Sequence, residues 1–85
     1  AYRQAGMQVV DLSPMGKGVP DLLVGYRGLT ALCEVKDGEK PASKCKLTVQ
    51  EQEFHDTWPG RVFIAYDPID AVEQMISYAK EMGRL

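Results

Sequence analysis

The chain has 85 residues, of which 45% are hydrophobic, 26% charged and 8% aromatic, and its formal net charge is -2. This length and composition are typical of one small globular domain over residues 1–85, and they exclude a multidomain, disordered or disulfide-stapled protein. No apolar run approaches the roughly 18 residues that cross a bilayer, so we expect a cytoplasmic protein with no membrane partner. The acidic balance argues against bulk electrostatic binding of nucleic acid, so any such binding must depend on local charge.

The first twenty residues predict a helix end, a strand and a loop. Residues 1–6 resemble the last turn of a helix closed by Gly6, so we expect the N-terminal helix to be truncated. Residues 7–12 alternate weakly and predict a first strand, whereas residues 13–20 contain two prolines and two glycines and predict a long, flexible loop.

A β-hairpin follows. Residues 21–26 and 29–36 flank the dipeptide Arg27-Gly28, in which the glycine can adopt a positive φ. We therefore predict two antiparallel strands joined by a two-residue turn.

The second half of the chain predicts a helix, a buried strand and a last helix. Thr48-Val-Gln-Glu51 is a capping box and predicts a helix that ends at Trp58. Residues 61–66 are mostly apolar, with β-branched and aromatic side chains, and predict a buried strand. Residues 67–83 predict a helix whose apolar face contains Ile69, Val72, Ile76 and Ala79. The fold class is therefore α/β, a mixed β-sheet flanked by helices, with a right-handed crossover to the last strand.

The hairpin places two acidic residues opposite each other. With a two-residue turn, Tyr26 pairs with Leu29, and counting outward sets Asp21 opposite Glu34. Two full charges about 5 Å apart repel by about 3 kcal/mol at an effective dielectric constant of about 20. A divalent cation would remove this repulsion, and two carboxylates with open coordination positions suit Mg²⁺.

A lysine joins the two carboxylates. Strand side chains alternate, so Lys36 lies on the same face as Glu34, while Cys33 and Val35 point the other way. Two carboxylates and a lysine suit metal-assisted phosphodiester hydrolysis, in which the lysine orients or deprotonates the nucleophile. The alternative is a structural ion pair in which Lys36 only neutralises the carboxylates.

These residues resemble a known family. Gly18-Val-Pro-Asp-Leu-Leu-Val-Gly25 followed by Glu34-Val-Lys36 is similar to the PD-(D/E)xK nuclease signature. With Leu47-Thr48 and Phe54-His55-x-x-Trp58, it resembles the VRR-NUC branch. The resemblance implies a restriction-endonuclease-like αβββαβ core and DNA cleavage. It also implies Mg²⁺ or Mn²⁺ bound by Asp21, Glu34 and the main-chain carbonyl of Val35, and Lys36 serving the attacking water.

The sequence differs from the VRR-NUC pattern at two positions. The family usually has a glutamate on the N-terminal helix, and this chain begins after it. Many relatives also have a glutamine where Glu51 stands, so we expect Glu51 and the adjacent Gln52 to support the site from outside the metal ligands. Candidate DNA contacts are four lysines in the loops, Lys17, Lys40, Lys44 and Lys46. His55, Phe54, Trp58 and Cys33 are expected to be core residues.

The prediction is a Mg²⁺- or Mn²⁺-dependent DNA endonuclease. Stand-alone members of the VRR-NUC branch resemble dimeric Holliday junction resolvases, so we expect a homodimer acting on branched or junction DNA. One alternative is a catalytically degenerate nuclease fold that acts as a DNA-binding or interaction module, which the net charge of -2 and the missing glutamate favour. A restriction-type or single-strand nuclease is also open.

Overall fold

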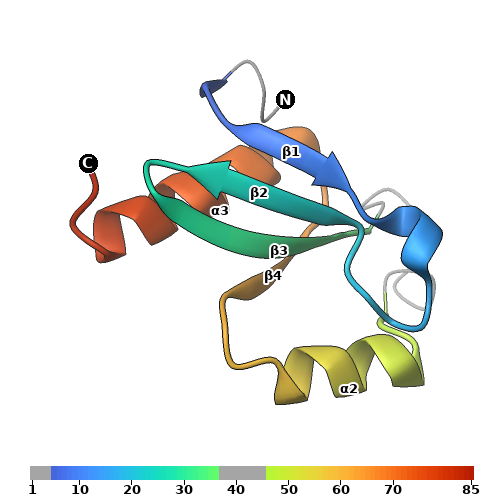
Figure 1. The fold of residues 1–85 in the computed structure, drawn as a ribbon. Coiled ribbons are helices and arrows are strands. Elements are labelled where there is room, and N and C mark those ends of the chain that lie inside the picture. The colour runs from blue at the N-terminus through green and yellow to red at the C-terminus, as the bar shows by residue number, and fades with distance from the viewer. Residues whose placement is uncertain (1–4, 37–45) are drawn as a thin grey trace.

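A computed structural model describes residues 5–36 and 46–85 of the chain. Most of the expected N-terminal helix end, and the loop with Lys40 and Lys44, lie outside these residues. The described part forms a small α/β fold with a four-stranded mixed sheet and two α-helices (Figure 1). No helix in this part is long and apolar enough to cross a membrane.

The sheet confirms the predicted mixed topology. Its strands are β1 (Gln8–Asp11), β2 (Leu22–Tyr26), β3 (Leu29–Val35) and β4 (Val62–Ala65), and they lie side by side in chain order. The first three are antiparallel, whereas β4 runs parallel to β3 after the crossover through the first helix.

The hairpin turn has the predicted form. Arg27 and Gly28 both have positive φ, 51° and 81°, as a two-residue type I′ turn requires. Tyr26 pairs with Leu29, and the register continues to the pair Leu22 and Cys33 at the other end. Asp21 and Glu34 are the next residues outward from this last pair, and their side chains interact, since Asp21 contributes to the raised pKa of Glu34.

The two helices lie on different sides of the sheet. Helix α3 (Pro68–Glu81) lies behind the sheet and α2 (Val49–Thr57) beneath it (Figure 1). The core forms between α3 and one sheet face, and its fully buried members include Val24, Cys33 and Met75. Leu32, Glu34 and Lys36 alternate with the core residues of β3 and therefore face away from α3.

Helix α3 confirms most of the predicted apolar face, because Ala79 is buried and Val72 and Ile76 pack partly buried against the core. Its buried residues are Ala71, Met75 and Ala79, which recur every fourth position, whereas the side chain of Ile69 is 71% exposed. Small residues at 71 and 79 let the helix approach the sheet closely, and Ile69 in the first turn extends past the sheet.

Two further core predictions are wrong. Strand β4 lies at the edge of the sheet and buries only Ala65, because no strand pairs with its outer side in the described chain. Gln74 and Asp70 of α3 partly cover that edge, donating to the Ile64 carbonyl at 2.6 Å and accepting from the Tyr66 N–H at 3.0 Å. Trp58 is 45% exposed, and its ring stacks on Phe54 with centroids 5.2 Å apart.

The segment before β2 is more structured than the predicted loop. It contains a 3₁₀ turn, η2 (Ser13–Met15), and the Leu12 N–H donates to the Asp21 carbonyl at 2.7 Å. Gly18 has φ +81°, and a Cβ there would lie 2.5 Å from the carbonyl oxygen of Gln50. The backbone therefore passes directly against the start of α2, three residues before Asp21.

Candidate active site

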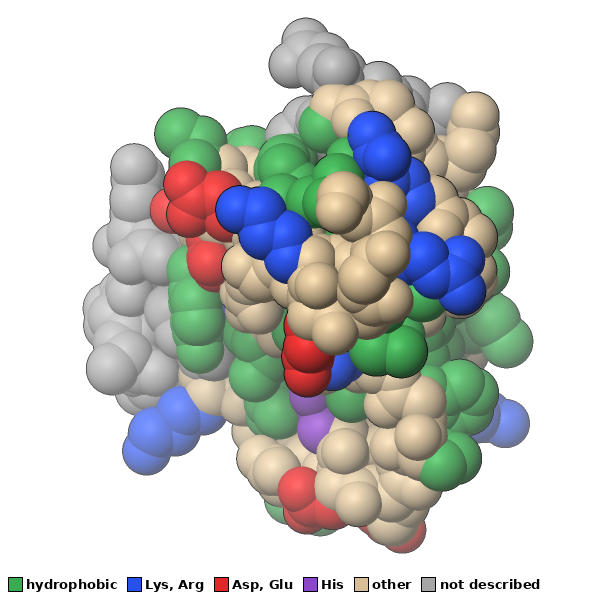
Figure 2. All heavy atoms as spheres, turned by 90° about the vertical axis from the view of Figure 1, so that its left-hand side faces the viewer, with side chains coloured by type: hydrophobic (Ala, Val, Ile, Leu, Met, Phe, Trp, Pro, Cys, Tyr) green, Lys and Arg blue, Asp and Glu red, His purple; other side chains and the backbone are tan. Residues whose placement is uncertain are grey.

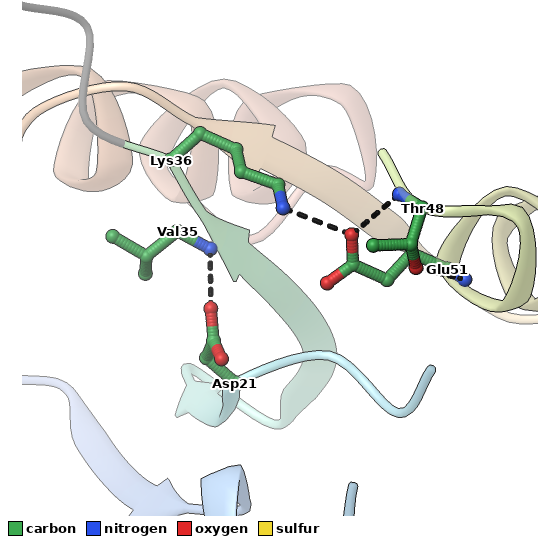
Figure 3. Close-up of polar contacts among 5 residues, drawn as sticks. All are labelled: Asp21, Val35, Lys36, Thr48 and Glu51. Atoms are coloured by element: carbon green, nitrogen blue, oxygen red, sulfur yellow. Dashed lines mark hydrogen bonds and ion pairs between the residues drawn. The ribbon is translucent and has the colours of Figure 1, made fainter. Parts of the chain in front are cut away.

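The candidate site is the end of the β2–β3 ladder farthest from the hairpin turn. Asp21 immediately precedes β2, and its Oδ2 accepts a hydrogen bond from the Val35 N–H at 2.9 Å (Figure 3). Glu34 lies opposite and is only 2% exposed, the only buried charged residue in the described chain. A buried carboxyl is therefore held against a second carboxyl.

Glu34 has a strongly perturbed acidity. Burial, and then the hydrogen bond and charge of Asp21, raise the pKa of Glu34 to about 8 from its ordinary 4.5. Its Oε1 is buried and has no hydrogen-bond partner in the described structure. A buried acceptor without a partner costs about 1–3 kcal/mol, so Glu34 is the least satisfied polar group of this site.

Lys36 is held in place by a helix cap. Its Nζ donates to Glu51 Oε1 at 2.9 Å, and the same oxygen accepts the Thr48 N–H at 2.8 Å (Figure 3). The Thr48 hydroxyl accepts the Glu51 N–H at 3.2 Å, which completes the predicted capping box. One oxygen of the Glu51 carboxylate therefore caps the N-terminus of α2 and also fixes the position of the Lys36 side chain.

The contact between Lys36 and Glu51 also determines the protonation states of both side chains. The hydrogen bond from Lys36 to Glu51 is the main cause that raises the pKa of the lysine. Burial opposes ionisation of Glu51, but hydrogen bonds from Lys36 and Thr48 leave the pKa of Glu51 below its ordinary value. Near neutral pH, the pair is therefore an ammonium and a carboxylate.

The remaining predicted residues lie in several places. Gln52 is exposed, and its amide donates to Asp56 on the same helix at 2.9 Å, not to the carboxylate cluster. Lys17 and Lys46 are exposed. Lys40 and Lys44 lie outside the described residues.

His55 is a neighbour of the site that sequence reasoning assigned to the core. Its Nε2 is buried without a hydrogen-bond partner in the described structure. Burial lowers the pKa of His55, and the charge of Glu51, one helical turn earlier, opposes this effect. The i, i+4 spacing from Glu51 was the only signal of this proximity.

The oxygen ligands present can be compared with the needs of a divalent cation. No group of three or more His, Cys, Asp or Glu side chains suited to a metal occurs in residues 5–36 and 46–85. Asp21 and Glu34 supply two carboxylates, and the Val35 carbonyl is the third proposed oxygen. Mg²⁺ commonly binds through one or two carboxylates and keeps several waters. The unpaired Glu34 Oε1 beside Asp21 is consistent with such a site.

Comparison with known proteins gives no relative. No family model, no curated protein and no solved structure matches this chain. Membership of the VRR-NUC branch therefore rests on the motif residues and remains a prediction.

Proposed function

We propose that this chain is a Mg²⁺- or Mn²⁺-dependent endonuclease that hydrolyses phosphodiester bonds in DNA. The observation that carries the proposal is the buried Glu34 carboxyl, placed opposite Asp21 with Oε1 unpaired. Lys36 follows on the same strand face and is bound to Glu51. An apolar pair or a neutral amide would be more stable at these positions in a purely structural role.

Asp21, Glu34 and the Val35 carbonyl would hold the cation. When bound, it would polarise the scissile phosphate and lower the pKa of a water. The Val35 N–H orients Asp21 by donating to Oδ2 at 2.9 Å. Glu34 must lose its proton to act as a ligand, and its pKa of about 8 means that binding near neutral pH releases this proton.

Lys36 would act as a cation. The hydrogen bond to Glu51 raises the pKa of Lys36, so the ammonium remains protonated near neutral pH and cannot accept a proton from water. It can donate to the attacking water or to a phosphate oxygen. Of the two roles considered for this lysine, orientation of the nucleophile is therefore the one that the geometry supports.

We further propose that the substrate is branched DNA and that the active form is a homodimer. The resemblance to the VRR-NUC branch supports a homodimer acting on Holliday junctions or other branched DNA. In a twofold-symmetric dimer, two sites stand at a fixed separation, which suits paired cuts on a symmetric junction.

A second candidate function is a DNA-binding or interaction module without activity. The described residues contain no group of three or more His, Cys, Asp or Glu side chains that could hold a metal ion, and the net charge is -2. Such a module would retain the fold and lack metal-dependent turnover.

One experiment separates the two functions. Labelled duplex, single-strand, flap, splayed-arm and four-way-junction DNAs are incubated with the protein in Mg²⁺, Mn²⁺ or EDTA. The proposal expects cleavage that needs metal and is lost in Glu34→Ala, which also controls for contaminating nucleases. Binding of these DNAs without cleavage in either metal would support the module, and cleavage unchanged in Glu34→Ala would refute the assigned site.

A further inference from the structure

Two arginines meet at the other end of the hairpin. Arg27 occupies the β2–β3 turn, and Arg84 follows α3, 57 residues later in the chain. Arg84 Nη1 donates to the Arg27 carbonyl at 3.2 Å, and Arg27 Nη1 lies 3.4 Å from the Arg84 carbonyl. These reciprocal contacts bring two guanidinium groups together at one exposed point, which we call the arginine pair.

The turn is shaped to accept the second arginine. Gly28 has φ +81°, and a Cβ there would lie 2.6 Å from Arg84 Nη1. Any side chain at this position would therefore displace the guanidinium as well as strain the backbone. The glycine of the turn leaves space for Arg84.

The arginine pair has no acidic partner in the described structure. The salt bridges there are Lys36–Glu51 and Arg61–Glu81, and neither includes Arg27 or Arg84. Each guanidinium has five N–H groups. Arg27 uses Nε toward the Tyr26 hydroxyl and Nη1 toward Arg84, and Arg84 uses Nη1. Both arginines are exposed, and the Arg27 guanidinium also lies 5.5 Å from the centroid of the Tyr26 ring.

Other Lys and Arg side chains lie on the same side of the molecule as the arginine pair (Figure 2). Figure 2 views the side of the molecule where the hairpin turn and the C-terminal residues lie, and it shows Lys and Arg side chains on its upper part with Asp and Glu side chains among them. Arg61, at the same end of the sheet, is neutralised by Glu81 at 2.8 Å. The arginine pair thus supplies positive charge with free, forked donors on a protein whose net charge is -2, and forked donors fit phosphate oxygens.

We propose that the arginine pair binds backbone phosphates of duplex DNA, at a second contact point remote from the candidate active site. This inference rests on the proposed function for the identity of its partner. Strand β3 (Leu29–Val35) lies between the two points, and from its first to its last Cα it spans six steps, which is about 20 Å at about 3.3 Å per step. A duplex rises about 3.4 Å per base pair, so about 6 base pairs would span this length of strand.

The test measures binding apart from cleavage. Fluorescence anisotropy in EDTA gives the affinity for duplexes of graded length between about 50 and 200 mM salt. The variants are Arg27→Gln, Arg84→Gln and the double variant. Arg61→Gln is the matched control, because it removes one arginine at the same end of the sheet that already has a carboxylate partner. Circular dichroism establishes that each variant is folded.

The expected result is a weaker salt dependence. The slope of log affinity against log salt should become shallower by about 1 for each single variant and by about 2 for the double variant. Arg61→Gln should leave the slope near that of the unmodified protein. The difference should appear only for duplexes longer than about 6 base pairs, since shorter ones cannot contact both points.

Two outcomes would overturn the inference. One is an unchanged slope in the double variant, and the other is an equal loss in Arg61→Gln, which would show only a change in overall charge. A loss of the same size, without a length threshold, on unstructured single strands would refute the duplex as the partner. Metal-dependent cleavage is measured separately on the same protein preparations with Mg²⁺ in place of EDTA, so a nuclease without this contact and a contact without nuclease activity give different results.

Discussion

The raised pKa of the buried Glu34 carboxyl predicts how the free energy of unfolding of the metal-free protein changes with pH. Its pKa is about 8 in the folded protein against 4.5 ordinarily, and a tenfold change in proton affinity corresponds to about 1.4 kcal/mol. Ionising Glu34 in the fold therefore costs about 5 kcal/mol, a large part of the roughly 5–15 kcal/mol that stabilises a typical domain. Solvent screens this charge little, because Glu34 is only 2% exposed.

Because the pKa of Glu34 is raised in the fold, the stability of the metal-free protein should fall as pH rises. A carboxyl with a raised pKa binds its proton more tightly in the folded state, so its contribution is complete below the unfolded pKa and declines as pH rises. The decline begins near the ordinary value of 4.5 and ends near the folded value of about 8. Between pH 5 and 8, the metal-free protein should lose about 4 kcal/mol from this group.

The assay is urea unfolding in EDTA at several pH values, comparing the unmodified protein with Glu34→Gln. Glutamine is neutral throughout, so the stability difference between the two proteins isolates Glu34 from other titrating groups such as His55. Asp21→Asn should reduce the pH dependence without removing it, because burial is the largest cause of the raised pKa. A stability difference between the unmodified protein and Glu34→Gln that stays constant from pH 5 to 8 would refute this account of the site.

Four further predictions concern the lysine, its helix cap, the loop before β2 and the cation. Lys36→Ala should lower kcat by about 10²-fold or more and leave DNA affinity nearly unchanged, whereas an unaltered rate would exclude its assigned role. Glu51→Gln should move the alkaline limit of the pH–rate profile to lower pH, because the charge that raises the pKa of Lys36 is lost; Thr48→Ala is its control and should cost about 1 kcal/mol of stability with that limit unchanged. Gly18→Ala should lower the melting temperature, since its Cβ would lie 2.5 Å from a backbone oxygen, and an unchanged value would show that the loop can move away. Mg²⁺ should raise the melting temperature of the unmodified protein at pH 7 but not of Glu34→Ala, as read by thermal melts with and without EDTA.

Part of the candidate site could be predicted because it depends on local rules. A two-residue turn at Arg27-Gly28 determines every pair of the hairpin, and strand alternation places Lys36 on the face of Glu34. The capping box of α2 is equally local, since its two hydrogen bonds join residues three apart. These features follow from chain geometry over a few residues.

The three-dimensional packing of the helices and strands decided which residues are buried and which are exposed. Periodicity does not show that β4 lies at the sheet edge, nor that α3 buries Met75 and exposes Ile69. Both depend on how the crossover and the small residues of α3 fit against the sheet, which is a property of distant segments.

The same distinction holds for function. The sequence alone determined the register of the hairpin from Tyr26–Leu29 to Leu22–Cys33, and hence that Asp21 and Glu34 follow at the same end, because the register is counted from the turn. Only the tertiary structure decided that Glu34 is buried with an unpaired oxygen, that Glu51 holds Lys36, and that Arg84 meets Arg27 across 57 residues. Burial and long-range contact arise when separate elements pack together, and local sequence patterns carry no direct record of that packing.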